Sequence, residues 1–500
     1  MMVYRMNSNE RFRRLMIWFA ILGITASAVV LQQIRPDQAD AETASEATDV
    51  DVEGNVADST RVEAASGATE AADDPLDASF HVSLQGELAA KLTIALQQLV
   101  PQTPPDQLLA QSEALRQGGF ADRMGYAILV GYLRGWNEGI ADAMEAPLPE
   151  SAVDEARALR GRVVDAMELR RALADGGDAE GKGALDAVAD LRPELGFFAD
   201  VVGPDAAAQA MPMLGVMLTA GCWYLLAFLG GLTSLVVLAV LLLTRKMIPV
   251  FAPAPTAHAA LVLGETFVLW IALFLMLQVL MGVLGAALGD ALGSSGQLLL
   301  SLVAMFGSLA ALAYPRMRGV SWSALRELIG LHAGRGIVRE TLAGLHCYVT
   351  AVPLLAIGLV IFAILSAIVS AIQGPSEAPS HPVVDLLGSA GPLEVLLLFT
   401  LASVAAPIVE EIAFRGLLYG HLRGTVAPHI RVVSALVAAI ASSVVFAIIH
   451  PQGVLFVPAL GGLAVGFCIF RELRGSLVAP MVAHGVSNAV TLTLGLSLMR

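Results

Sequence analysis

The chain has 500 residues, of which 56% are hydrophobic, and its mean hydropathy is +0.70. This composition excludes an ordinary soluble domain, because the apolar residues gather in runs long enough to cross a bilayer. The net charge of −14 says little about partners, since residues 36–79 alone carry 13 Asp or Glu against one Arg. We expect a lipid bilayer as the main environment of the chain and no nucleic-acid partner.

Residues 1–35 contain an apolar run, 15–31, that directly follows three arginines. This pattern is typical of a membrane anchor or a secretory signal segment. The small-residue pattern Ala39-Asp40-Ala41 lies several polar residues beyond the run, which favours an uncleaved anchor. Residues 36–79 hold too few large apolar side chains to offset chain entropy, so we predict an acidic, disordered linker there.

Residues 80–205 show apolar positions at helical spacing, for example Leu88, Leu92 and Leu99. Prolines after position 100 and the pair Gly118-Gly119 separate the helical stretches. The pattern predicts a small helical extracytoplasmic domain, and it contains no motif that indicates a chemistry.

Eight further apolar segments predict an all-α polytopic membrane bundle of about nine spans, counting the N-terminal anchor. We assign 211–314 to accessory transmembrane helices, 315–345 to a cytoplasmic amphipathic segment that lies in the interface, and 346–500 to a transmembrane core. The eight predicted spans are 220–243, 264–288, 297–314, 347–372, 393–414, 432–450, 455–470 and 477–498.

The short loops predict the orientation of the bundle. Lys and Arg gather in the loops on one side, including a loop with Arg423 and Arg431, whereas 289–296, 373–392 and 451–454 contain none. The side rich in Lys and Arg is the cytoplasmic one. The N-terminus is then cytoplasmic, residues 36–210 are extracytoplasmic, and the exported leader favours a bacterial inner membrane.

Three formal charges stand in one apolar segment, Glu410, Glu411 and Arg415. Charges in hydrocarbon are costly and commonly face a bundle interior or a water-filled cavity. Glu411 and Arg415 lie four residues apart and can pair on one helix face, so we interpret them as a structural pair. Glu410 points about 100° away from Glu411, and Pro407 predicts a local kink that opens space beside it.

Two later segments each carry a histidine, at His450 and His484, and Asn488 shares a helix face with His484. Hydrolysis of a peptide bond needs a water, a base and donors for the tetrahedral oxyanion. Glu410 and His450 could activate the water, while His484 and Asn488 could donate to the oxyanion. Glu410, His450 and His484 could also bind zinc, and their spacing does not separate a metal-free mechanism from a zinc-assisted one.

These motifs, Glu-Glu-x-x-x-Arg, Phe-x-x-x-His and His-x-x-x-Asn in this order, resemble those of the CPBP family of intramembrane proteases. That family includes the type II CAAX prenyl endopeptidases and the Abi proteins, and the resemblance covers roughly 320–498. It implies a protease or metalloprotease acting on a membrane protein or lipidated peptide. It implies Glu410 as the base, His450 as a water ligand, and His484 and Asn488 as groups on the oxyanion or metal side.

The same residues are compatible with other functions. A non-catalytic membrane scaffold or immunity factor could retain the same fold, and a proton-coupled transporter could use the same buried charges. Gly293-Ser294-Ser295-Gly296 matches the serine motif of rhomboid proteases, but a turn between spans is its ordinary explanation. A rhomboid mechanism would also leave Glu410 and Arg415 unexplained.

Overall fold

The structure, a computed structural model, describes residues 80–175, 189–203, 206–246, 254–373 and 390–499, with six positions between Arg13 and Ile21. In these residues every regular element is a helix and none is a strand, which confirms the predicted all-α class. The chain divides into two compact units, 53–221 with 497–500, and 1–52 with 222–496. The predicted linker 36–79 lies outside the described residues.

The smaller unit is a bundle of short helices around α6, which is buried on all sides. Glycines allow close packing here, because a Cβ at Gly125 would meet the Phe198 ring at 2.8 Å. Ser83 caps the first helix by accepting a hydrogen bond from Gly86 N. The helices are α3 (Leu84–Leu99), α4 (Pro105–Leu109), η1 (Ala110–Ser112), α5 (Glu113–Gln117), α6 (Phe120–Arg134), α7 (Trp136–Glu145), η2 (Glu150–Ala152), α8 (Val153–Ala174) and α10 (Phe197–Val202).

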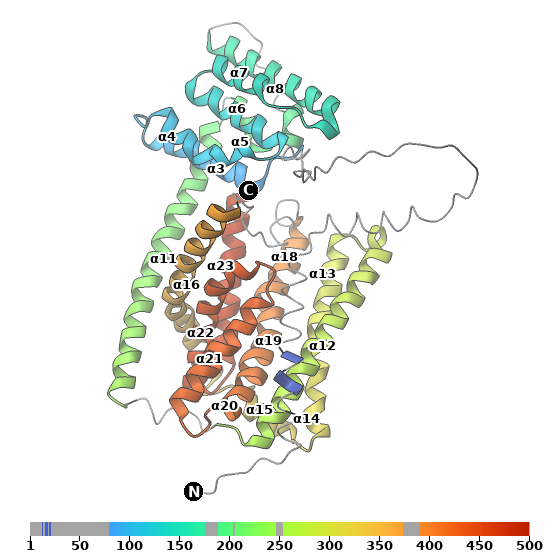
Figure 1. The fold of residues 1–500 in the computed structure, drawn as a ribbon, viewed down its shortest axis with the longest axis vertical. Coiled ribbons are helices and arrows are strands. Elements are labelled where there is room, and N and C mark those ends of the chain that lie inside the picture. The colour runs from blue at the N-terminus through green and yellow to red at the C-terminus, as the bar shows by residue number, and fades with distance from the viewer. Residues whose placement is uncertain are drawn as a thin grey trace, which may run out of the picture. The chain divides into compact units, whose positions relative to one another are not determined.

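The larger unit consists of long apolar helices that run side by side (Figure 1). Helix α11 (Ala206–Leu243) leads into it from the smaller unit. The others are α12 (Ala257–Ala287), α13 (Gly289–Gly307), η4 (Ser308–Ala313), α14 (Tyr314–Met317), α15 (Trp322–Ile329), α16 (Ile337–Gln373), α18 (Pro392–Thr400), η5 (Leu401–Ala405), α19 (Ala406–Glu411), η6 (Ile412–Leu418), α20 (Tyr419–Thr425), α21 (Arg431–Ile448), η7 (Val454–Phe456), α22 (Val457–Arg474) and α23 (Val478–Met499).

Eight helices among the described residues are long and apolar enough to cross a membrane, so this is a multi-pass membrane protein. Each overlaps one of the eight predicted apolar segments, and five contain the whole segment. Several are longer than predicted, because polar and amphipathic residues continue the helix beyond the apolar run. The span predicted at 393–414 runs from Pro392 to Thr425, and the one predicted from 347 begins at Ile337.

The prediction that Arg423 lies in a cytoplasmic loop is wrong. Helix α20 continues to Thr425, and Arg423 is only 3% exposed. Its guanidinium donates to both carboxylate oxygens of Glu472, at 2.8 and 3.2 Å, and to Ser434 Oγ at 3.1 Å. These partners make a buried arginine tolerable, so the positive charge belongs to the interior of the bundle.

Only six positions of the predicted N-terminal anchor, between Arg13 and Ile21, are among the described residues. Ile17 and Ile21 are buried in the same core cluster as Leu263 of α12. Arg13 forms an ion pair with Glu265 of α12. The described positions therefore pack into the larger unit.

Candidate active site

The two glutamates of the first motif lie on α19, a short α-helix between two π-helical segments, η5 and η6. Pro407, at the start of α19, lacks the N–H that would bond the carbonyl of Ser403. The local distortion predicted before Glu410 is thus present, as a π-helix rather than a sharp kink. Single π-helical turns inside α-helices are frequent at functional sites, because they redirect the side chains that follow.

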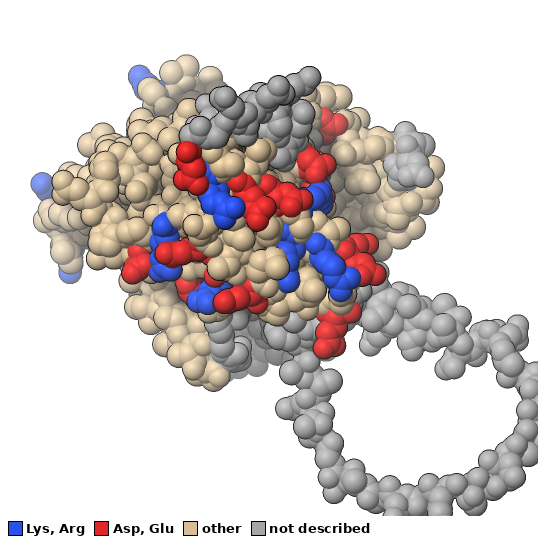
Figure 2. Space-filling view, turned by 90° about the horizontal axis from the view of Figure 1, so that it is seen from above, with Lys and Arg blue, Asp and Glu red and all other residues tan. Residues whose placement is uncertain are grey.

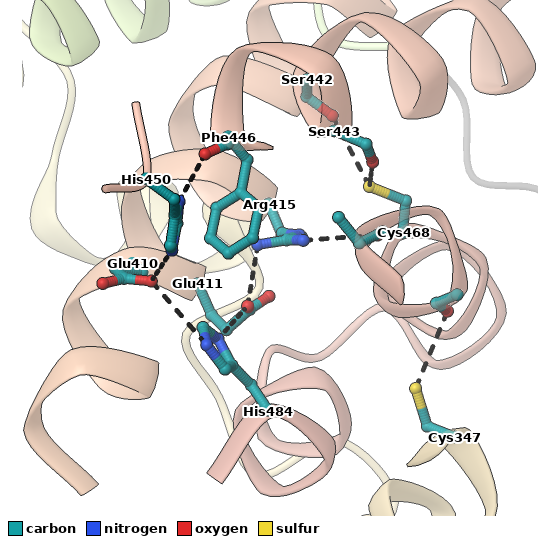
Figure 3. Close-up of polar contacts among 12 residues, drawn as sticks. Cys347, Glu410, Glu411, Arg415, Ser442, Ser443, Phe446, His450, Cys468 and His484 are labelled. Carbon is teal, nitrogen blue, oxygen red and sulfur yellow. Dashed lines mark hydrogen bonds and ion pairs between the residues drawn. The ribbon is translucent and has the colours of Figure 1, made fainter. Parts of the chain in front are cut away.

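Glu410 faces both histidines (Figure 3). Its Oε2 lies 3.8 Å from His450 Nε2 and 3.8 Å from His484 Nε2. This oxygen is buried and makes no hydrogen bond, while the side chain as a whole is 19% exposed. A buried carboxylate oxygen without a donor is costly, so it calls for a ligand that can donate to it.

The other nitrogen of each imidazole is held by an oxygen, and this fixes the orientation of both rings. His450 Nδ1 lies 2.6 Å from the carbonyl oxygen of Phe446, which can only accept, so Nδ1 donates there. His484 Nδ1 lies 2.9 Å from Glu411 Oε1 and donates to that carboxylate. Both Nε2 atoms therefore face Glu410. His450 lies in the turn that follows α21, and His484 lies in α23.

Glu411 and Arg415 form the predicted structural pair, with Arg415 Nη1 2.8 Å from Glu411 Oε1. Their side chains are 0% and 1% exposed. The guanidinium lies over the rings of Phe446, at 4.5 Å, and Phe467, at 5.2 Å, in contacts of the cation–π type. Because Glu411 Oε1 also accepts from His484, the pair connects the framework of the bundle to one imidazole of the site.

Asn488 has a partner that the sequence did not indicate. Its Nδ2 donates to the carbonyl of Ala402, 2.7 Å away, in the π-helical segment η5. On the same face of α23, a Cβ at Gly485 would stand 2.5 Å from the carbonyl oxygen of Ser403. Helix α23 therefore packs directly on the irregular backbone before α19, and one amide hydrogen of Asn488 is engaged there.

A second buried polar cluster was missed by the sequence analysis. Tyr419 donates to Glu472 Oε2 at 2.7 Å, and Arg423 pairs with the same carboxylate. A signal for the cluster was present, because Tyr419 and Arg423 continue the four-residue spacing of Glu411 and Arg415. This cluster links α20 to α22 through side-chain hydrogen bonds.

The serine of the rhomboid-like motif does not face a histidine. Ser295 Oγ donates to Glu394 Oε1 at 2.5 Å, and Gly293 has a φ of 59°, which suits a turn. The predicted loop is therefore wrong for residues 294–296, which are helical in α13, and the chain leaves the helical conformation only at Gly293.

The donor types at Glu410, His450 and His484 suit zinc, and in zinc sites the second imidazole nitrogen is likewise held by an oxygen. Tetrahedral zinc with bonds of about 2.0–2.1 Å would place its ligand atoms about 3.4 Å apart, closer than the two 3.8 Å separations. In the part of the chain that the structure describes, no group of three or more His, Cys, Asp or Glu is arranged to hold a metal ion. The site as it stands does not fit a metal.

A comparison with protein families matches residues 392–490 to a model described as type II CAAX prenyl endopeptidase Rce1-like. This confirms the resemblance to the CPBP family over the segment that carries all three motifs. No curated protein and no solved structure matches the chain.

Proposed function

We propose that this membrane protein is an intramembrane endopeptidase that cleaves a membrane-associated or lipidated protein or peptide. At the level of the family, residues 392–490 belong to a CAAX-type protease segment. The observation that carries the proposal is the geometry around Glu410 Oε2, a buried oxygen without a donor that two imidazole nitrogens face at 3.8 Å. A water placed beside Oε2, off the lines to the two nitrogens, would contact these groups no more closely than a hydrogen bond and would bridge the carboxylate to the imidazoles.

The proposed reaction uses the chain's own side chains. Glu410 takes a proton from the water while His450 Nε2 orients it, and the water oxygen forms a bond to the scissile carbonyl carbon. When the tetrahedral intermediate collapses, the C–N bond breaks and the proton on Glu410 passes to the leaving amine. Water is the only co-reactant that this balance requires.

His484 is the proposed oxyanion donor. Its Nδ1 donates to Glu411 and its Nε2 faces Glu410, so Nε2–H would point into the site and donate to the oxyanion. The second amide hydrogen of Asn488 is free to contribute, since Ala402 engages only one. Glu411 and Arg415 support the site by holding His484 in place.

We also propose the location of the protein from its charge pattern. Lys and Arg in the short loops place the N-terminus in the cytoplasm and residues 36–210 outside a bacterial inner membrane. The internal position of Arg423 removes one of the charges counted, but Arg316, Arg318, Arg335 and Arg339 lie on the same side and keep the asymmetry. The helical domain would then meet the extracytoplasmic space.

The test is cleavage of a lipid-embedded prenylated peptide by the reconstituted full-length protein and its Glu410→Gln variant. Loss of a general base lowers rates by about 10²–10⁴-fold, so we expect the cleavage rate of Glu410→Gln to fall at least about 10²-fold. Glu394→Gln is the matched control, because Glu394 lies in the same span and pairs with Ser295. Cleavage by Glu410→Gln at the rate of the control would refute the proposal.

The same assay decides between the metal-free mechanism and zinc assistance. We expect cleavage to persist after treatment with a chelator, because the separations in the site exceed those of a zinc centre. Loss of cleavage that zinc restores would instead make Glu410, His450 and His484 ligands.

A further inference from the structure

A shallow, open cleft lies at the end of the bundle where α22 ends and α16 and α23 begin. Its volume is about 450 Å³, and its walls include Trp322, Arg326, His332, Ile337, Val478 and Met481. None of these residues belongs to the proposed active site. The cleft goes beyond the proposed protease activity, and its function can be tested without that activity.

Hydrogen bonds hold the walls of the cleft together. Leu477 N donates to the carbonyl of Gly330 at 2.8 Å, and Ser476 Oγ donates to the carbonyl of His332 at 2.6 Å. Arg471 Nη2 donates to the carbonyl of Leu328 at 3.2 Å. These bonds tie the end of α15 and the segment after it to the end of α22 and the start of α23, so the cleft belongs to the packed bundle.

Among the residues that line the cleft, Arg326 carries a positive charge. The segment from Tyr314 to Glu340 contains five Arg and two Glu. Glu340 is buried in an ion pair with Arg474, and the exposed Glu327 faces His332 at 3.7 Å. Arg326 donates only its Nε, to the carbonyl of Leu331 at 3.2 Å, and within the described residues no carboxylate pairs with it. Its terminal nitrogens remain to bind an anion.

The surroundings of the cleft are apolar and exposed. Trp322 is 50% exposed, and Ile337 and Val338, at the start of the span formed by α16, are 58% and 69% exposed. Exposed tryptophan and aliphatic side chains beside arginines at the end of a membrane span are typical of the headgroup region of a bilayer. A freely soluble anion would gain nothing from these apolar walls, whereas a lipid would.

We propose that this cleft binds an anionic phospholipid. The phosphate group lies against the guanidinium of Arg326, and the upper part of an acyl chain lies along Trp322, Ile337 and Met481. Guanidinium groups pair with phosphate through two parallel N–H donors, which Arg326 still offers. The amphipathic segment thus selects lipid headgroups in addition to lying in the interface.

The test is retention of phosphatidylglycerol against phosphatidylcholine of the same chains, measured by native mass spectrometry of the full-length protein taken from mixed vesicles. A basic residue at a membrane surface contributes about a fivefold change in binding of anionic lipid, so Arg326→Gln should lower the preference for phosphatidylglycerol about fivefold. Arg316→Gln is the matched control, because Arg316 belongs to the same segment but does not line the cleft. Its preference should match that of the wild type.

Several results would overturn the proposal. They are an absence of preference for phosphatidylglycerol in the wild type, equal losses in the two variants, or competition by soluble glycerol phosphate as effective as by the lipid. A second measurement uses phosphatidylglycerol brominated on its acyl chains, which quenches nearby tryptophan. The quenched fraction of the fluorescence should fall in Trp322→Phe, and an unchanged fraction would place the chain elsewhere.

Discussion

At the scale of single residues, the buried pair of Glu411 and Arg415 decides whether the site can form. Each charge is desolvated, so neither is stable without the other. Glu411 also accepts from His484, and Arg415 lies against Phe446, the residue whose carbonyl orients His450. One ion pair therefore supports both imidazoles.

Removal of one partner should be more damaging than removal of both. Glu411→Gln leaves Arg415 buried without its counter-ion, and we expect the free energy of unfolding to fall by about 3–5 kcal/mol. The double variant Glu411→Gln/Arg415→Met should recover much of this loss, because no uncompensated charge remains. Unfolding in mixed micelles, followed by circular dichroism, measures both. Equal destabilisation of the single and double variants would contradict this account.

The ion pair of Glu411 and Arg415 could be predicted from the sequence, because two residues four apart in one helix lie on the same face. The sequence also predicted that Glu410, His450 and His484 meet, on the strength of the motifs. The partner of Arg423 could not be predicted in the same way, since Glu472 lies 49 residues away and only the tertiary fold brings the two side chains together. Asn488 shows the same limit, because its bond to Ala402 depends on a π-helix that no residue pattern specified.

At the scale of elements, the site depends on how α23 packs on the segment before α19. The π-helical turn η5 precedes Glu410, and Gly485 allows α23 to approach the carbonyl of Ser403. His484 is the neighbour of Gly485, so the same approach brings its imidazole to Glu410. The distance between these two helices therefore sets the geometry of the site.

A methyl group at Gly485 should push the helices apart. Its Cβ would stand 2.5 Å from a backbone oxygen, which cannot move aside as a flexible side chain can. We expect Gly485→Ala to lose about 1–3 kcal/mol of stability, as overpacked sites do, and most of its cleavage activity. Gly461→Ala is the control, because its nearest neighbour is 4.0 Å away. Thermal unfolding and cleavage assays should separate the two, and equal behaviour would argue against the close approach.

At the scale of the whole molecule, hydropathy located the eight described spans but underestimated the length of several of them. Helix α20 illustrates the reason. Its polar residue Arg423 lowers the local hydropathy, yet hydrogen bonds to Glu472 and Ser434 allow it to stay buried inside the bundle. In the smaller unit, charges of both signs neutralise one another, as in the pairs Arg162–Glu194 and Arg157–Asp154. Figure 2 shows the two signs intermingled on the coloured residues of one face, so this face offers no single-sign surface that would identify a partner.

The proposed topology predicts which surfaces an impermeant thiol reagent reaches. Asp154→Cys in the helical unit should react in intact cells, whereas Ser323→Cys in α15 should react only after the membrane is opened. Both positions are exposed, and the background should lack Cys222, which is also exposed. The reverse labelling pattern would invert the topology.

The central claim is that Glu410 and His450 act together on one water molecule, and a double-mutant cycle of cleavage rates tests it most directly. Glu410→Asp retains a carboxylate and measurable activity, and His450→Gln removes the imidazole. Groups that act as one unit give strongly non-additive losses. We therefore predict that the double variant is little slower than the slower single variant, whereas losses that multiply would show that the two side chains act independently.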